Sequence, residues 1–232
     1  MDLTHYNLLA SLFDYPREDY TQMIAKTRDY MLKNYPEAGD ELSAFYDELP
    51  THALRQMQEL FTKSFDVQSI TALDVGYVMF GEDYKRGELL SHMNKEQVEC
   101  GNDCHSELAD HLPNVLRLMA LLGENPEKQE TLDELVQIIL APVVNKMIAE
   151  FAPERLEKKK EAYQKHYKTL IESPREGALA YSHALKGLSL VLTEDFDLNN
   201  IENLQSIPDK SVDFLKSITQ ELEIEGDNNA HA

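Results

Sequence analysis

Apolar residues recur at helical spacing along most of the chain, and prolines separate the segments that carry them. Pro16, Pro36 and Pro50 delimit the first three segments. Proline has no N–H for an interior helical position and clashes with the preceding turn, so it marks helix boundaries. Within 17–35, four side chains fall on one helix face: Tyr20, Ile24, Thr27 and Met31. The pattern predicts an all-α protein, a single bundle of about eight to eleven helices without a sheet.

Three later stretches need separate interpretation. Val75–Phe80 has the composition of a strand, but we favour a helix running from about Val67 to Phe80, because no second strand exists to pair with it. A long helix is expected over 127–151, with a kink or break near Pro142. The segment 178–192 is apolar on nearly all sides, which indicates a central helix.

The stretch 106–122 contains the clearest local signal for a helix start. Pro113 fits only a first turn, where N–H groups lack intrahelical partners. We therefore predict that the helix starts at Asp110, whose side chain would be the N-cap and would accept from the Leu112 N–H. The residues that follow form one apolar stripe: Leu112, Val115, Leu116, Met119 and Leu122.

Charge narrows the range of partners. The 232 residues contain 22 Lys and Arg against 42 Asp and Glu, a formal net charge of −20. Such a chain repels nucleic acid and anionic lipid and suits a basic partner. No apolar run reaches the length of about 18 residues that a spanning helix needs, and residues 1–16 lack a signal-peptide pattern. We expect a cytoplasmic protein that neither inserts into a membrane nor binds nucleic acid.

The chain changes character after residue 193. Residues 194–232 contain ten acidic residues and two basic ones, Lys210 and Lys216, which gives a net charge of −8 (2 − 10). High charge with low hydrophobicity favours disorder. We therefore expect a helical domain over 1–193 and an acidic, partly disordered tail over 194–232. The connector 100–110, rich in Gly, Asn and Asp, is the hinge candidate within the domain.

A metal site is the alternative chemistry to consider. Cys100, Cys104, His105 and His111 lie within twelve residues, and thiolates with imidazoles suit Zn²⁺. The spacing is Cys-x3-Cys-His, however, and no second pair follows. A metal-binding hydrolase or sensor built on this cluster stays open as the alternative function. We find no Gly-rich phosphate loop, nucleophile elbow or His-Glu-x-x-His motif, and we do not expect an enzyme.

One motif points to a family. The stretch Glu107-Leu-Ala-Asp110-His111-Leu-Pro113 resembles the Glu-x-x-Asp-His signature of the NarJ/TorD/DmsD chaperones for molybdoenzymes. Its Asp-His-Leu-Pro sequence is most similar to that of the NarJ branch, which serves nitrate reductase assembly. Lys85-Arg86-Gly87 after a polar turn, and the opening Tyr6 to Pro16, extend the resemblance over about 3–192. One departure is Leu108-Ala109, where many TorD members carry a proline.

The resemblance implies a cytoplasmic, all-helical chaperone rather than an enzyme. Such proteins bind the N-terminal segment of an apo-molybdoenzyme catalytic subunit, often a twin-arginine signal peptide, until the molybdenum cofactor is inserted. They carry no cofactor of their own, and the resemblance allows a monomer or a domain-swapped dimer. Asp110 would orient the helix and offer negative charge, and His111 would line the site. The other implied client-binding residues are Pro113 at the helix entry, Leu116 and Met119 as an apolar wall, and Glu107, Arg86 and Tyr6.

Overall fold

The computed structural model of this chain describes residues 1–50, 53–167 and 179–198. Within these ranges the protein is all-α, as the apolar pattern predicts, and it contains no strand. The helices are α1 (Tyr6–Ser11), α2 (Tyr20–Asn34), α3 (Pro36–Glu48), α4 (Leu54–Phe65), α5 (Val75–Phe80), α6 (Tyr84–Glu99), α7 (Leu112–Glu124), η1 (Pro126–Lys128, a 3₁₀ turn), α8 (Gln129–Glu134), η2 (Leu135–Leu140, a π-helix), α9 (Ala141–Glu150), α10 (Pro153–Tyr167) and α11 (Ala180–Asp195).

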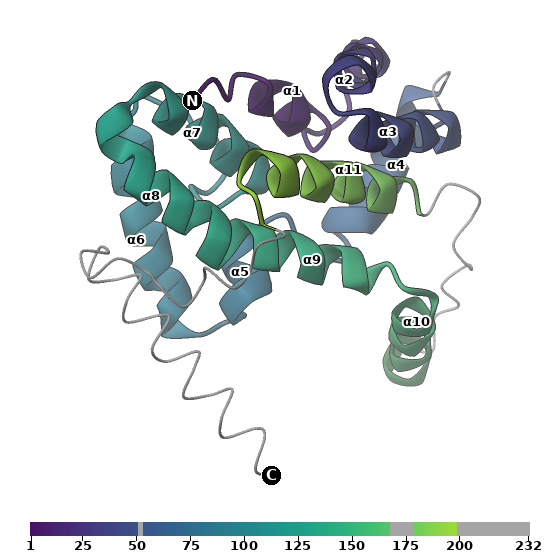
Figure 1. Cartoon of the computed structure of the whole chain (residues 1–232). Coiled ribbons are helices and arrows are strands. Elements are labelled where there is room, and N and C mark those ends of the chain that lie inside the picture. Colours follow the sequence, from purple (N-terminus) through teal and green to yellow (C-terminus); the bar gives the residue numbers. More distant parts are fainter. Residues whose placement is uncertain (51–52, 168–178, 199–232) are drawn as a thin grey trace.

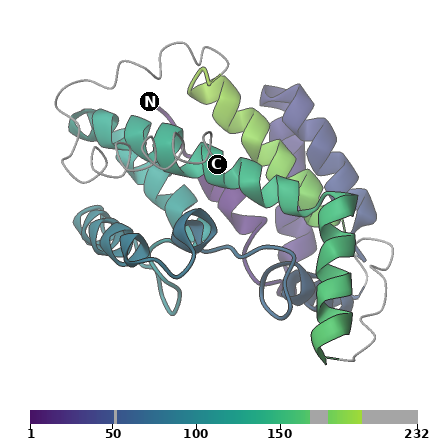
Figure 2. The same ribbon diagram turned by 90° about the horizontal axis from the view of Figure 1, so that it is seen from below.

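Helix α11 is the central element of the bundle. It packs against α3 on one side and α9 on the other, while α1 lies against α7 and α2 (Figure 1). Its buried face carries Tyr181, Leu185, Leu188 and Leu192. Helix α10 projects from the far end of α9, as both views show (Figure 2). The expectation of an apolar central helix near 178–192 is confirmed from Ala180 onward; residues 168–178 lie outside the described ranges.

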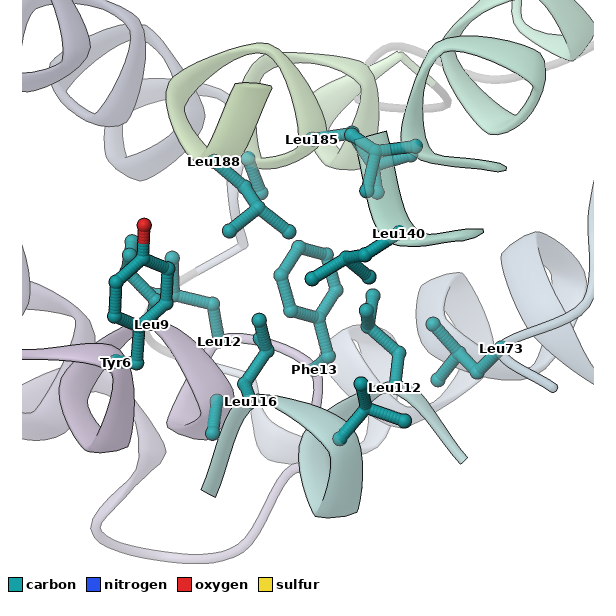
Figure 3. Close-up of a cluster of buried hydrophobic side chains, with 14 of the residues drawn as sticks. Tyr6, Leu9, Leu12, Phe13, Leu73, Leu112, Leu116, Leu140, Leu185 and Leu188 are labelled. Atoms are coloured by element: carbon teal, nitrogen blue, oxygen red, sulfur yellow. The ribbon is translucent and has the colours of Figure 1, made fainter. Parts of the chain in front are cut away.

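One part of the core forms where α7, η2 and α11 meet the residues that follow α1. Phe13 lies at the centre of this cluster, with Leu116, Leu140 and Leu188 around its ring (Figure 3). All four side chains are fully buried. Burying one such side chain stabilises the fold by roughly 1.5–3 kcal/mol. Leu116 therefore ties α7 into this part of the core.

Proline placement and helix faces follow the predicted pattern closely. Helix α2 buries the predicted side chains Tyr20, Ile24, Thr27 and Met31. Pro36 stands in the first turn of α3, where its missing N–H costs nothing. Near Pro142, where we expected a kink or break, the helix continues through the π-helix η2, in which the Ala141 N–H bonds to the Val136 carbonyl. A π turn just before a proline accommodates the hydrogen bond that proline cannot donate.

The segment between α4 and α5 corrects one prediction. Val75–Phe80 is helical as predicted, but the residues from Asp66 to Asp74 are irregular. Val67 is 60% exposed, and Gln68 has a left-handed backbone (φ 51°). Leu73 and Val75 bond instead to the backbone near Asp110, which holds this segment extended. A helix starting at about Val67 was therefore the wrong interpretation, because apolar spacing does not reveal a long-range backbone pairing.

Polar side chains hold the connector between α6 and α7, where the sequence suggested a hinge. Buried Gln97 of α6 donates to the Ala109 carbonyl at 3.0 Å. Asn114 of α7 donates to the Leu108 carbonyl at 3.0 Å. Asn102 donates to the Gln97 side-chain oxygen at 2.6 Å. The connector is thus tied to both helices that it joins.

The end of α11 carries acidic residues that the sequence assigned to the tail. Glu194 and Asp195 are helical, so the boundary at residue 193 falls inside α11. The Asp195 carboxylate accepts from the Tyr35 hydroxyl at 2.8 Å and lies 2.8 Å from Nε2 of buried His5. The remaining tail prediction concerns 199–232, which lie outside the described residues.

One further test concerns membranes. Within the described ranges, no single helix is both long and apolar enough to cross a bilayer. In that part of the chain, one pair of segments, Pro126–Glu150 and Pro153–Lys159, satisfies the length and composition criteria when taken together, and the pair is bent by 70° at its junction.

Candidate functional site

The starts of α5 and α7 are joined by a short antiparallel backbone pairing between Asp74 and His111. The Val75 N–H donates to the Asp110 carbonyl, and the Leu112 N–H donates to the Leu73 carbonyl, both at 2.9 Å. Since α6 packs on α5, the first turn of α6 lies nearby. Four charged or ionisable side chains from these three helix starts meet here: Asp74, Arg86, Asp110 and His111. We call them the interhelix cluster.

Asp110 has a different role from the predicted one. Its side chain is fully buried, and its Oδ2 accepts from the Gly76 N–H at 3.1 Å. Gly76 is the second residue of α5, so Asp110 caps α5 rather than its own helix. Helix α7 begins at Leu112 with His111 at the N-cap position and no side-chain cap. The predicted bond from Leu112 cannot form because that N–H is used by Leu73.

Asp74 connects the other members of the cluster. Its Oδ2 accepts from Arg86 Nη2 at 2.9 Å, and its Oδ1 lies 3.2 Å from His111 Nδ1. Arg86 Nε lies 3.6 Å from the Asp110 carboxylate. The guanidinium also stacks over the Tyr77 ring, 5.3 Å from its centroid. The cluster thus alternates carboxylates with basic groups, above one aromatic ring.

The two carboxyl groups have opposite pKa shifts. The hydrogen bond with His111 and the positive charge of Arg86 lower the pKa of Asp74, against an opposing effect of burial. Burial, followed by the nearby charge of Asp74, raises the pKa of Asp110, although Arg86 and the Gly76 N–H act in the other direction. Asp74 is therefore the firmly ionised member, and Asp110 is the carboxyl whose charge is costly.

The predicted site residues separate into two groups. Arg86, Asp110 and His111 meet in the cluster, and the side chains of Arg86 and His111 remain 19% and 18% exposed. Glu107 is exposed in the connector outside it. The remaining predicted residues lie in the core and present no surface to a client: Tyr6, Pro113, Leu116 and Met119.

Sequence reasoning missed Asp74, Gly76 and Tyr77. One signal was available, because an Asp directly before an apolar helical segment is a common N-cap residue type. No local pattern, however, links Asp74 to His111, which follows 37 residues later. Gly76 is required by close approach: a Cβ there would lie 2.8 Å from Asp110 Oδ2. The partners of these residues are set by tertiary pairing alone.

The alternative metal cluster is not assembled. His111 faces Asp74, and His105 is exposed and lies 3.1 Å from the carboxylate of its neighbour Asp103. Burial is the main cause that raises the pKa of both Cys100 and Cys104, which disfavours their thiolate forms. In 1–50, 53–167 and 179–198, no three His, Cys, Asp or Glu side chains are placed to hold a metal ion.

The two cysteines give the first testable prediction. Replacing both Cys100 and Cys104 with serine should change the free energy of unfolding by no more than about 1 kcal/mol, because both side chains are only half-buried and make no disulfide. Urea denaturation measures the stability, and elemental analysis of both proteins measures bound zinc. Loss of the fold together with loss of stoichiometric zinc would support the metal-site alternative.

Comparisons with known proteins leave the family undetermined. No protein-family model and no curated protein matches this chain.

Proposed function

We propose that this protein is a cytoplasmic chaperone of the NarJ/TorD type, which binds the N-terminal segment of an apo-molybdoenzyme catalytic subunit before cofactor insertion. One observation carries the proposal. Arg86, Asp110 and His111 belong to two separate segments of the family resemblance, and they meet in a single partly exposed cluster. This proximity supports the proposal, because it brings both segments of the resemblance to one surface. In this role the protein is a binding partner and not an enzyme.

The surface around the cluster suits a basic peptide. The side chain of Asp74 is 31% exposed, and Tyr77 is 41% exposed beside it. Helix α5 also carries half-buried Val78, Met79 and Phe80, which can receive apolar side chains of the peptide. The client-binding surface that we propose therefore consists of Asp74, Tyr77 and His111. Buried Asp110 lies beneath this surface and caps α5 through the Gly76 N–H.

The direct test is capture of the client. The tagged full chain is purified from its native host, and the proteins bound to it are identified by mass spectrometry. We expect the catalytic subunit of a molybdoenzyme that contains substoichiometric molybdenum. Recovery of no molybdoenzyme subunit, under conditions in which the host makes one, would count against the proposal.

A variant pair tests the binding surface itself. His111→Ala should weaken binding of the client's N-terminal peptide by about tenfold, since it removes a polar side chain of the proposed surface and the contact that positions Asp74. The matched control is His105→Ala, an exposed histidine in the same connector that makes no contact with the cluster. Calorimetric titration measures both affinities, and circular dichroism checks folding.

Titrations at two salt concentrations separate the contribution of charge attraction to peptide affinity from that of shape complementarity. Binding of a basic peptide to the wild-type chain should weaken as ionic strength rises, because screening reduces attraction between exposed charges. Equal affinities for His111→Ala, His105→Ala and wild type in folded protein would remove His111 from the client-binding surface.

A further inference from the structure

Arg86 occupies a position that resembles a binding site for a guanidinium group. Its guanidinium lies between two carboxylates, 2.9 Å from Asp74 and 3.6 Å from Asp110, and over the Tyr77 ring. Carboxylates recognise guanidinium through paired hydrogen bonds, and aromatic faces attract it through their quadrupole. Here the protein supplies both the site and the group that fills it.

The fit of Arg86 is incomplete. Only one of its nitrogens, Nη2, forms a hydrogen bond to a carboxylate of the cluster, because 3.6 Å from Nε to Asp110 is too long for one. Nε of Arg86 and Oδ1 of Asp110 are both buried and have no hydrogen-bond partner. A buried polar atom without a partner is costly. The two carboxylates therefore retain acceptor capacity that Arg86, tethered to the first turn of α6, does not use.

The site is also open to exchange. The Asp74 and Arg86 side chains are 31% and 19% exposed, and Tyr77 is 41% exposed. Arg86 is the third residue of α6, where the helix dipole disfavours a cation. An arginine on a separate chain is free of both constraints and can approach the carboxylates with its two outer nitrogens.

We propose that Asp74, Asp110 and Tyr77 form a guanidinium-binding site that Arg86 fills in the free protein, and that an arginine side chain of a bound peptide displaces Arg86 from it. This inference rests on the proposed function, because it assigns the ligand chemistry and the regulation of the same surface. Arg86 acts as an internal competitor. In the absence of a client, Arg86 neutralises the carboxylates of the interhelix cluster. A peptide without arginine cannot displace it and therefore binds more weakly.

The test uses Arg86→Met, which keeps an unbranched apolar stem over Gly76 and Tyr77 but removes the competing charge. Arg117→Met is the matched control, because Arg117 likewise donates one hydrogen bond to a carboxylate, that of Asp14, away from the cluster. Both variants lose one positive charge. The probes are hexa-arginine and hexa-lysine amides of equal charge, titrated into each full-length protein by calorimetry.

We expect Arg86→Met to bind hexa-arginine about tenfold more tightly than wild type does, the gain that corresponds to a site that Arg86 leaves vacant about one-tenth of the time. Hexa-lysine should gain no more than it gains in Arg117→Met, since lysine cannot form paired hydrogen bonds. Adding Asp74→Asn to Arg86→Met should abolish the gain. Equal or weaker binding of hexa-arginine by Arg86→Met, relative to Arg117→Met, would overturn the proposal.

A measurement on the wild-type chain covers the case in which Arg86→Met fails to fold. Nitrogen-15 NMR follows the Arg86 Nε–H signal, which should move towards the position of a solvent-exposed arginine as hexa-arginine is added. A signal that stays unchanged at saturation would contradict displacement. Neither experiment uses a molybdoenzyme, so the guanidinium site can hold while the chaperone proposal fails, and client capture can succeed while Arg86 proves to be a fixed structural residue.

Discussion

Gly76→Ala is expected to destabilise the protein by about 2–3 kcal/mol, although alanine is the better helix former. The added Cβ would lie 2.8 Å from Asp110 Oδ2, 3.2 Å from Leu89 Cδ2 and 3.3 Å from Arg86 Cγ. Asp110 is fully buried, and the Cβ would be closer to its carboxylate than real Cβ contacts allow, so the carboxylate must shift. Moving it would also break its hydrogen bond from the Gly76 N–H, which caps α5.

Gly87→Ala is the matched control for this effect. Gly87 lies in α6, and a Cβ there would meet nothing within 4 Å. This substitution should therefore stabilise the protein by about 0.5–1 kcal/mol through helix propensity alone. Urea denaturation of the three proteins measures the difference. Similar changes for the two glycines would mean that Asp110 does not contact α5 closely.

Asp110→Ala is expected to lower the free energy of unfolding by about 2–4 kcal/mol. The change removes the cap of α5 and leaves the buried Nε of Arg86 without the nearby carboxylate, so that Asp74 alone neutralises the guanidinium. Asp110→Asn separates the two contributions, because its side-chain oxygen can still accept from the Gly76 N–H while the charge is lost. Asparagine should therefore retain more of the wild-type stability than alanine does. An asparagine variant as unstable as the alanine variant would show that the charge of Asp110, rather than its capping bond, provides the stabilisation.

The pH dependence of the same variant checks the raised pKa of Asp110. A carboxyl whose pKa is raised above 3.8 in the folded state binds its proton more tightly there than in the unfolded chain. Its contribution to the free energy of unfolding is therefore present at low pH. It is lost as pH rises from about 3.8 through the raised pKa of the folded state. Asp110→Asn lacks this loss, so its stability relative to wild type should improve as pH rises above about 3.8. Asp74 contributes in the opposite direction, with stability lost as pH falls below 3.8, but both proteins share this effect.

Local periodicity and proline placement were sufficient for most of the fold. The buried face of α2 and the central position of α11 follow from side-chain spacing within one segment. The site was less accessible to this reasoning. The motif identified Asp110 and His111, but not that Asp110 is buried beneath α5 or that His111 faces Asp74. Both facts depend on a backbone pairing between segments 37 residues apart, for which the sequence contains no local signal.

The central position of α11 has a consequence for synthesis of the chain on the ribosome. Helices α1 to α9 emerge first, yet the apolar faces of α3 and α9 find their common partner only when Ala180–Asp195 has been made. Until then, the nascent chain exposes core surface and is prone to aggregation. Ribosomes stalled before codon 180 should therefore carry a protease-sensitive chain, whereas stalling well beyond codon 195 should leave the α1–α9 segment protected.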